Sequence, residues 1–383
     1  MRHWLISACI ALAVVLVSGS SVASIYAWQL TNRVGDNALD ITNGNADAEV
    51  PPPTIGEIAG AVNVLAVGLD NVPDQSAAFG ERDGTLNDVN ILLHIAADHE
   101  SAVVLSLPRD LIIPGPACTD PVTGETFRSV SAQPLNSAIS RGGLGCVVST
   151  VSELTGLTIP YAAVFSFEGT VAMSDAVGGV PICLDTAIND PLSGLDLPAG
   201  VSVVSGQQAL SYLRSRKGVG DGSDLARISS QQSYMASLMR VMKSSDTLTD
   251  IPKVLRLANA AVDNVKLSDS LAPLPAMIGM VLALKDVDLD KLTFVTYPSV
   301  PYTRDPNKVQ PAMGTAEALM AKIRDDTPFT LDADALGNSL TVEATAPAAT
   351  PAPAPSAPAV EPPNVIEGVR GVTGDQETCS VGH

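Results

Sequence analysis

Apolar residues recur in the first third of the chain in a way that predicts three strands. Residues 62–68 are mostly apolar, which is typical of a buried strand. Residues 89–95 carry an apolar side chain at every second position and begin beside Asp88, so they predict a second strand. Residues 102–107 form a third apolar run, and Pro108 ends it because proline cannot donate a hydrogen bond to a sheet.

A different period, with apolar residues three and four positions apart, begins at Asp224 and predicts a helix. Leu225 and Met235 belong to its apolar stripe, whereas Asp224, Arg227 and Gln231 share another face. Strands interspersed with helices indicate an α/β domain. Shorter segments complete the prediction, with helices at 150–154, 170–176, 206–212 and 270–285 and strands at 182–184 and 292–296.

The N-terminal segment predicts export of the main domain. Residues 4–28 contain no charged side chain, and as a helix they would extend about 37 Å, enough to cross a bilayer. Trp4 and Trp28 stand at its ends, where interfacial aromatic residues are common, and Arg2 favours a cytoplasmic N-terminus. A cleaved signal peptide is the alternative, because Ser-Val-Ala at 21–23 offers a small-x-small cleavage site. Both interpretations place the main domain outside the cytoplasm.

Changes in composition divide the chain into five parts. The anchor at 1–28 is followed by a polar linker at 29–57, which contains a triple proline. The predicted strands and helices fill a large domain at 58–335. An Ala/Pro-rich linker at 336–363 then precedes a C-terminal tail at 364–383.

The distribution of charge predicts a local anion-binding site. The 383 residues include 22 Lys+Arg against 41 Asp+Glu, for a formal net charge of −19. Nucleic-acid binding is excluded by this balance, because it needs a basic face. Four arginines nevertheless gather in three short stretches, at Arg109, at Arg214 and Arg216, and at Arg227. Guanidinium groups grip phosphate bidentately, so this grouping predicts a phosphate or pyrophosphate site.

Two aspartates are candidates for a magnesium site. Asp88 begins the second predicted strand and Asp110 follows the third, so both could reach one ion if these strands run antiparallel. Mg²⁺ favours one or two carboxylates together with phosphate oxygens. The simpler interpretation is that both aspartates only stabilise turns. Arg109 and Asp110 are neighbours on an extended chain and are expected to point apart, which suggests separate roles.

The other charged residues also have simpler interpretations. Arg214 and Arg216 could form the solvated basic end of a helix. Asp224 could be an N-cap whose ion pair with Arg227 joins positions three residues apart. Against these interpretations stands the convergence of four arginines in a chain with few of them.

The cysteine count predicts disulfide bonds. Cys9 lies in the predicted membrane segment, which leaves an even number of cysteines in the exported part. Zinc is disfavoured because the chain contains no CxxC pair. We expect Cys118–Cys146 to join the loop that follows the third strand, and Cys183–Cys379 then follows by elimination.

Several motifs, in this order, resemble the LytR-CpsA-Psr family of cell-wall glycopolymer ligases over residues 60–245, and more loosely beyond. Pro-Arg-Asp at 108–110, Gly-Gly-Val at 178–180, Arg-x-Arg at 214–216 and Asp-x-x-Arg-x-x-x-Gln at 224–231 are more specific together than any one alone. The remaining matching pieces are 67–70, 87–89, 135–138, 142–143, 175–177, 206–210 and 212–213.

The resemblance implies a fold and a reaction. The fold would be one export anchor followed by an extracytoplasmic α/β domain with a mixed central β-sheet flanked by helices. This domain would hold a polyprenyl-pyrophosphate in a hydrophobic cleft and transfer its glycopolymer to peptidoglycan through a phosphodiester, with Mg²⁺ as cofactor. The alternatives are a hydrolase of the same lipid pyrophosphate and a non-catalytic envelope protein with a regulatory or binding role.

The resemblance also implies roles for individual residues. Asp88 and Asp110 would bind Mg²⁺ and form the catalytic centre with Arg109. The family often has lysine where this chain has Pro134 and arginine where it has Ser230, so two expected cations are missing. The implied pyrophosphate ligands are Arg109, Arg214, Arg216, Arg227, Gln231 and Asn136, with Asp224 and Asp70 in supporting positions.

Overall fold

The fold is known from a computed structural model. The predicted membrane segment at 4–28 and most of the Ala/Pro-rich linker lie outside the residues that it describes. Within the described part, none of the helices combines the length and the apolar character that a membrane crossing requires. The described residues are 33–35, 37–44, 56, 58–70, 85–244, 250–337, 339–342 and 364–383.

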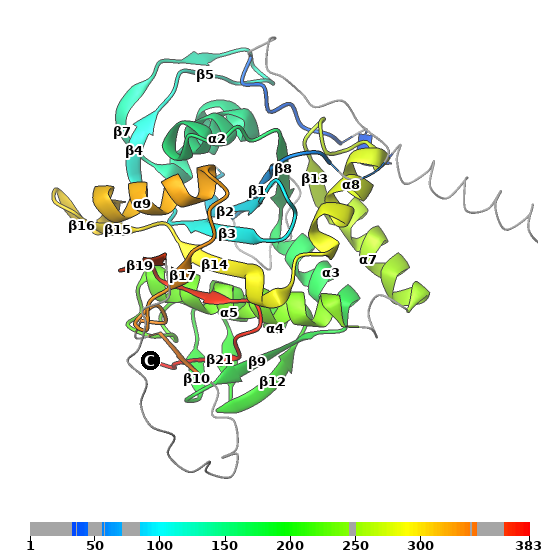
Figure 1. The fold of residues 1–383 in the computed structure, drawn as a ribbon, viewed down its shortest axis with the longest axis vertical. Coiled ribbons are helices and arrows are strands. Elements are labelled where there is room, and N and C mark those ends of the chain that lie inside the picture. The colour runs from blue at the N-terminus through cyan, green and yellow to red at the C-terminus, as the bar shows by residue number, and fades with distance from the viewer. Residues whose placement is uncertain are drawn as a thin grey trace, which may run out of the picture.

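A mixed seven-stranded sheet forms the centre of the molecule, as predicted (Figure 1). Its three middle strands, in the order β1-β2-β3, are the three strands expected from the apolar pattern. β2 runs antiparallel to both β1 and β3. Parallel strands β8 and β14 flank them, and antiparallel strands β13 and β20 form the edges. The bounds are β1 Val62–Leu69, β2 Asn87–Ile95, β3 Ala102–Leu107, β8 Tyr161–Phe165, β13 Val265–Leu267, β14 Leu292–Thr296 and β20 Gly371–Thr373.

Alternating side chains of the central strands enter two different hydrophobic cores. Leu65 and Val67 of β1 pack into the core on one face of the sheet, against the helices α2 and α9. Val62 and Val64 of the same strand pack into the core on the other face, against α5 and α8. The helices are α2 Ile139–Thr155, α3 Phe167–Val177, α4 Gly206–Arg214, α5 Asp224–Lys243, α7 Ile251–Asn264, α8 Leu274–Lys285 and α9 Met313–Arg324.

A second, four-stranded sheet lies below the central one in Figure 1, with α4 and α5 between the two sheets. Its order is β12-β9-β21-β18, so the strand nearest the C-terminus lies in its interior. Residues 364–383, which the sequence sets apart as a tail, thus add β20 to the central sheet and β21 to the second. The bounds are β9 Val180–Leu184, β12 Gly200–Val204, β18 Leu340–Val342 and β21 Thr378–Ser380.

Two cysteine pairs lie at bonding distance, in the pairing that the sequence predicts. The sulfur atoms of Cys118 and Cys146 are 1.95 Å apart, and those of Cys183 and Cys379 are 1.93 Å apart. The second pair joins β9 to β21, across which these two cysteines are register partners. It therefore holds the C-terminal strand in the second sheet.

The region between β3 and α2 contains small antiparallel strand pairs. β4 pairs with β7, and β5 pairs with β6. The remaining elements are β4 Ile112–Gly115, β5 Cys118–Thr119, β6 Thr126–Phe127, β7 Val130–Pro134, β10 Ile188–Asp190, β11 Leu195–Leu197, β15 Ser299–Tyr302, β16 Asp305–Pro311, β17 Thr330–Leu331, β19 Val365–Ile366, and the 3₁₀ helices η2 Leu135–Ser137 and η3 Leu289–Lys291.

Candidate functional site

Asp88 and Arg109 face each other where β2 begins and β3 ends. The two strands are antiparallel, and the register that pairs Asn90 with Leu107 brings Arg109 opposite Asp88. Nη1 of Arg109 lies 2.8 Å from Oδ2 of Asp88, and both side chains are largely buried. The antiparallel arrangement on which the sequence argument depended is therefore confirmed.

The first turn of α5 adds a second carboxylate and a second guanidinium. Ser223 caps this helix, because its side chain accepts a hydrogen bond from the backbone N–H of Ala226. Asp224 is therefore not the cap, and its Oδ1 instead lies 2.7 Å from Nη2 of Arg227 and 3.4 Å from Nε of Arg109. The interpretation of Asp224 as an N-cap is wrong, whereas its ion pair with Arg227 is confirmed.

Asp110 brings a third carboxylate, and Lys308 a further cation. Oδ2 of Asp110 lies 3.5 Å from Nε of Arg109, and its Oδ1 lies 2.5 Å from Nζ of Lys308. The backbone N–H of Val309 donates to the carbonyl of Asp110, which fixes β16 beside it. The expectation that Arg109 and Asp110 point apart is thus wrong, because the chain turns after β3 and the alternation of a strand no longer applies.

The charges of this cluster act strongly on one another. Burial opposes the charge of Arg109, but three neighbouring carboxylates outweigh it and raise the pKa of its guanidinium. Burial lowers the pKa of Arg227; Asp224 and Asp88 oppose this shift, whereas the positive charges of Arg109 and Arg216 add to it. Both side chains remain cationic at any physiological pH. An additional anion beside Arg227 would relieve this repulsion.

Several polar atoms of the cluster are buried without a hydrogen bond. They include Oδ1 of Asp88, Nε of Arg109 and Nε of Arg227, none of which has a hydrogen-bond partner among the described residues. Both oxygens of Asp224 are in the same condition, although Oδ1 lies within ion-pair distance of the arginines. Buried polar atoms are normally satisfied. The unfilled N–H donors therefore indicate a place for a ligand with oxygen acceptors, and the unfilled carboxylate oxygens a place for a cation or a hydrogen-bond donor.

The segment from Arg214 to Arg216 lies at the C-terminal end of α4, and its two arginines have different contacts. Arg216 is close enough to lower the pKa of Arg227, and its Nε donates to the carbonyl of Gly222. Arg214 instead places its guanidinium carbon 4.5 Å from the centre of the Phe167 ring. The structure therefore brings Arg216 near Arg227, and it places the guanidinium of Arg214 over the Phe167 ring.

Three further candidates contact the backbone around the cluster. Nε2 of Gln231 donates to the carbonyl of Leu213 over 2.8 Å, which ties α5 to the end of α4. The backbone N–H of Asn136 donates to the carbonyl of Arg109 over 2.9 Å. Asp70 is 2% exposed, and its Oδ1 accepts from the N–H of Leu86, just before β2 begins. Through these contacts, Gln231, Asn136 and Asp70 support the segments that carry the charged residues.

Asp88 and Asp110 provide the kind of ligand that magnesium uses. No group of three or more His, Cys, Asp or Glu side chains that could hold a metal ion occurs in the part of the chain that the structure describes. Asp88 and Asp110 provide two carboxylates, and Oδ1 of Asp88 is buried without a hydrogen-bond donor. Mg²⁺ is commonly held by one or two carboxylates while water and phosphate oxygens fill its other positions. The residues present therefore fit this ion.

Apolar side chains continue from the charged cluster along α5. Arg227 and Gln231 are followed at helical spacing by Met235 and Met239, which are only partly buried. Ile91 and Leu93 of β2 and Met280 and Leu284 of α8 are likewise partly buried against the same core. On α5, these partly buried apolar side chains begin one helical turn after Gln231.

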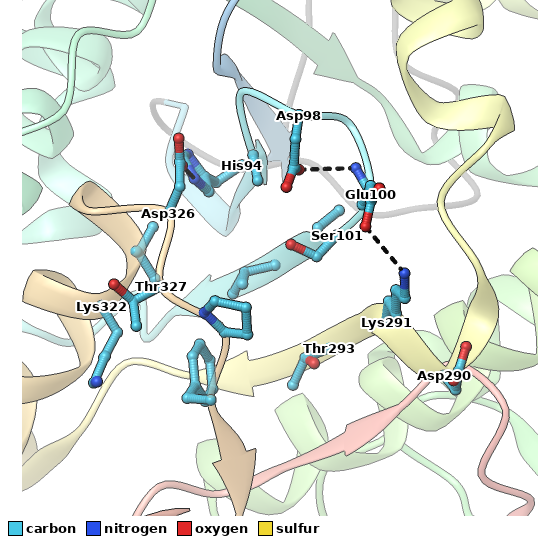
Figure 2. A pocket seen from close by; sticks show the side chains of 16 residues that line it. His94, Asp98, Glu100, Ser101, Asp290, Lys291, Thr293, Lys322, Asp326 and Thr327 are labelled. Carbon is cyan, nitrogen blue, oxygen red and sulfur yellow. Dashed lines mark hydrogen bonds and ion pairs between the residues drawn. The ribbon is translucent and has the colours of Figure 1, made fainter. Parts of the chain in front are cut away.

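A separate pocket lies at the other end of the same strands. Figure 2 shows His94 and Asp326 at one side of it and the ion pair of Lys291 with Glu100 at another. Its volume is about 240 Å³. Because His94 is near the end of β2, whereas Asp88 is near the beginning, this pocket is not part of the charged cluster.

Sequence reasoning missed two residues of the site. Lys308 lies 198 positions from Asp110, and no local motif marks it. Asp190, which is 2% exposed, accepts from the hydroxyl of Ser215 and from the backbone N–H of Arg216, and so holds the segment that carries Arg216. Only the fold brings these residues to the cluster.

Comparison with known proteins gives a consistent result. The family model described as the LytR_cpsA_psr family matches residues 26–322. The cell wall biosynthesis protein LcpA of Corynebacterium glutamicum is 31% identical over 264 residues, which are 62% of this chain and 50% of that protein. The polyisoprenyl-teichoic acid–peptidoglycan teichoic acid transferase TagT of Bacillus subtilis is 25% identical over 241 residues, 61% of this chain and 68% of that protein.

The chain spans about half the length of the first curated relatives it matches. Among solved structures, protein gbs0355 of Streptococcus agalactiae has a TM-score of 0.55 at 19% identity, covering 70% of this chain and 88% of its own. The LytR-Csp2A-Psr enzyme of Actinomyces oris has a TM-score of 0.52 at 20% identity, covering 71% of this chain and 95% of its own. These two structures share the fold.

Proposed function

Because the chain belongs to the LytR-CpsA-Psr family, we propose that it transfers a glycopolymer from a polyprenyl-pyrophosphate carrier to peptidoglycan through a phosphodiester. The name of the relative TagT describes such a transfer for teichoic acid, from a polyisoprenyl carrier to peptidoglycan. The protein would thus be a phosphotransferase whose donor is a lipid-linked glycan.

One observation carries this proposal. Arg109 and Arg227 are largely buried side by side, and each has an Nε atom without a hydrogen-bond partner among the described residues. Two buried guanidinium groups with unused donors suit the oxygens of a pyrophosphate, which accept several charge-assisted hydrogen bonds at once. Arg216 and Lys308 add positive charge at the edges.

The reaction would be an in-line displacement at the phosphorus that carries the glycan. A peptidoglycan sugar hydroxyl attacks this phosphorus, the bond to the bridging oxygen of the pyrophosphate breaks, and polyprenyl phosphate leaves. The hydroxyl proton passes to a carboxylate, for which Asp88 and Asp110 are the candidates. Such a reaction depends on positioning and charge neutralisation more than on a covalent nucleophile. Arg109 would stabilise the charge that develops on the phosphoryl oxygens.

Magnesium would be held by Asp88 and Asp110, with Lys308 limiting the negative charge on Asp110. When bound, the ion would neutralise phosphate oxygens. Arg109 is paired with the same two carboxylates, so it is set to exchange a carboxylate partner for a phosphate partner when the donor binds.

The carrier lipid would extend from this cluster along α5. Met235, Met239, Ile91 and Leu93 provide partly buried apolar surface that continues from Arg227. The predicted anchor at 4–28 would keep the domain outside the cytoplasm and next to the membrane in which the carrier resides.

Product analysis with the purified full chain in detergent tests this function. The assay combines a lipid-pyrophosphoryl oligosaccharide, Mg²⁺ and peptidoglycan fragments, and we expect a glycan joined to peptidoglycan through phosphate. A free glycan that ends in phosphate would identify a hydrolase instead. Binding of the donor without turnover would identify a non-catalytic envelope protein, and either result overturns the proposal.

A further inference from the structure

The helix α8 is apolar on all sides, although one side is exposed. From Leu274 to Leu284 it contains no polar side chain. Leu274, Ile278 and Val281 share one face by their spacing, and Ile278 and Val281 are 46% and 67% exposed. We call these three residues the outer face of α8. A helix at the surface of a protein in water normally presents polar residues there, so this face indicates contact with something apolar.

The remainder of α8 packs on the core beside the proposed lipid-binding surface. Ala283 is buried in that core, and Met280 and Leu284 pack against it while they remain partly exposed. Leu284 lies three positions after Val281, so the surface proposed for the carrier lipid borders the outer face on the same helix.

The N-terminal part of the chain is attached close to α8. Val34 is 5% exposed, and Leu39 pairs with Ser268, six residues before the helix. Figure 1 shows this N-terminal segment, in blue, beside β13 and α8, and β12 at the far end of the molecule. The Cβ of any larger residue at Gly279 would come within 2.8 Å of the carbonyl oxygen of Gly56, so the N-terminal chain also packs directly on α8.

The distance from this attachment to the predicted membrane segment is short. Nη1 of Arg33 lies 3.5 Å from Oδ1 of Asp263 in α7. Trp28, the last residue of the predicted anchor, precedes Arg33 by five positions, and five extended residues span about 17 Å at most. If residues 4–28 cross the membrane, the end of the domain that carries α7 and α8 lies next to the bilayer.

We propose that the outer face of α8 rests on the lipid surface of the membrane that holds the anchor. This inference rests on the proposed function in that it needs an anchored, exported chain. A small apolar face is sufficient, because a short tether keeps its effective concentration at the bilayer high. Contact at α8 would turn the surface lined by Met280 and Leu284 toward the bilayer, from which the polyprenyl chain of the donor must come.

Fluorescence quenching by brominated lipids tests the contact directly. The full chain carries two tryptophans, Trp4 and Trp28, which are replaced by phenylalanine to remove the background. A single tryptophan is then introduced by Val281→Trp or, as a matched control, by Val203→Trp on β12. Val281 and Val203 are 67% and 63% exposed, so the two probes begin with equal access to solvent. The proteins are reconstituted into phosphatidylglycerol and phosphatidylethanolamine vesicles with brominated acyl chains.

We expect emission from the Val281→Trp probe to be quenched several-fold more than emission from the Val203→Trp probe. Equal quenching would overturn the proposal, as would a chain that does not float with the vesicles. Emission that is blue-shifted but unquenched would assign the face to a second copy of the chain and would also overturn it. Quenching does not depend on turnover, so quenching without transfer would contradict the proposed function and leave the membrane contact standing.

A kinetic test places a charge on the outer face of α8 and needs no tryptophan probe. In Val281→Asp we expect transfer from a donor embedded in vesicles to fall several-fold, because the charge opposes contact with lipid. Transfer from a short-chain donor in solution should fall much less, because that donor reaches the charged cluster without any contact between α8 and lipid. Equal rates with the embedded donor for Val281→Asp and the parent chain would contradict the contact.

Discussion

Arg109 and Asp88 join the ends of two antiparallel strands through a contact of 2.8 Å between Nη1 and Oδ2. The register of these strands favours the pair, because the ladder ends at Asn90 and Leu107, two positions from Asp88 and from Arg109. Each member also has an unsatisfied buried atom, so the contact leaves both able to bind a further group. The pair thus links the central sheet directly to the proposed chemistry.

Replacement of Arg109 by lysine tests the need for a guanidinium fork. Lysine retains the charge between the carboxylates but cannot bind two phosphate oxygens bidentately. We expect transfer to fall about 100-fold or more, as when one stabilising donor is lost, with little change in the thermal midpoint. The measurements are initial rates and thermal unfolding of the full chain.

Arg128→Ala is the control for this variant, because Arg128 is an exposed arginine outside the cluster. It should keep the parent rate. A large loss of thermal stability in Arg109→Lys, with the rate unchanged in correctly folded protein, would make Arg109 a structural residue only.

Replacement of Lys308 by methionine should change two kinetic quantities in opposite directions. Without the ammonium group of Lys308, the negative charge of Asp110 is no longer partly neutralised by a neighbour. Less Mg²⁺ should therefore be needed for half-maximal rate. The donor loses a nearby cation, so its KM should rise about tenfold, as for a hydrogen bond to a charged group. Rates measured against Mg²⁺ and against donor concentration separate the two effects.

The control for Lys308 is Lys291→Met. Lys291 also pairs with a carboxylate, that of Glu100, but it lies at the opposite end of the strands. Both kinetic quantities should be unaffected in this control. If Lys308→Met behaved identically to it, the lysine would have no part in the site.

The positions of Lys308 and Asp190 explain what the sequence could not predict. Strands and helices with a clear period were found, because their residues repeat locally, and the motif around Arg109 indicated the phosphate chemistry. Lys308 comes from a hairpin with no such period, and its contact with Asp110 spans 198 positions. The helices at Ile251–Asn264 and Met313–Arg324 were not predicted either.

Asp190 should make the stability of the domain depend on acid. Burial opposes its charge, but hydrogen bonds from Ser215 and from backbone N–H groups outweigh burial and lower its pKa below the usual 3.8. A carboxylate whose pKa is lower in the folded chain stabilises it above the unfolded value, and this contribution is lost as the pH falls through the folded value. We therefore expect the thermal midpoint to fall steeply below about pH 4.

Asp190→Asn should begin with a lower midpoint at pH 7 and show a shallower fall in acid, since it has no carboxylate to protonate. Losing one such hydrogen-bonded charge costs about 1–3 kcal/mol. Asp196→Asn, on the paired strand β11 and exposed, is the control and should follow the parent chain. Identical acid profiles for Asp190→Asn and the parent would show that Asp190 does not set this dependence.

The bond between Cys183 and Cys379 should stabilise the domain strongly. It closes a loop with a sequence separation of 196 residues, and a cross-link of that kind typically contributes about 2–4 kcal/mol through the unfolded state. We expect the double variant Cys183→Ser/Cys379→Ser to unfold at a lower denaturant concentration. An unchanged midpoint would mean that the β9–β21 pairing holds without the bond.

The place of β21, between β9 and β18, has a consequence for biogenesis. Residues 364–383 are synthesised after the other described residues, and they supply one strand to each of the two sheets. Neither sheet can therefore be complete until residues 364–383 have left the ribosome.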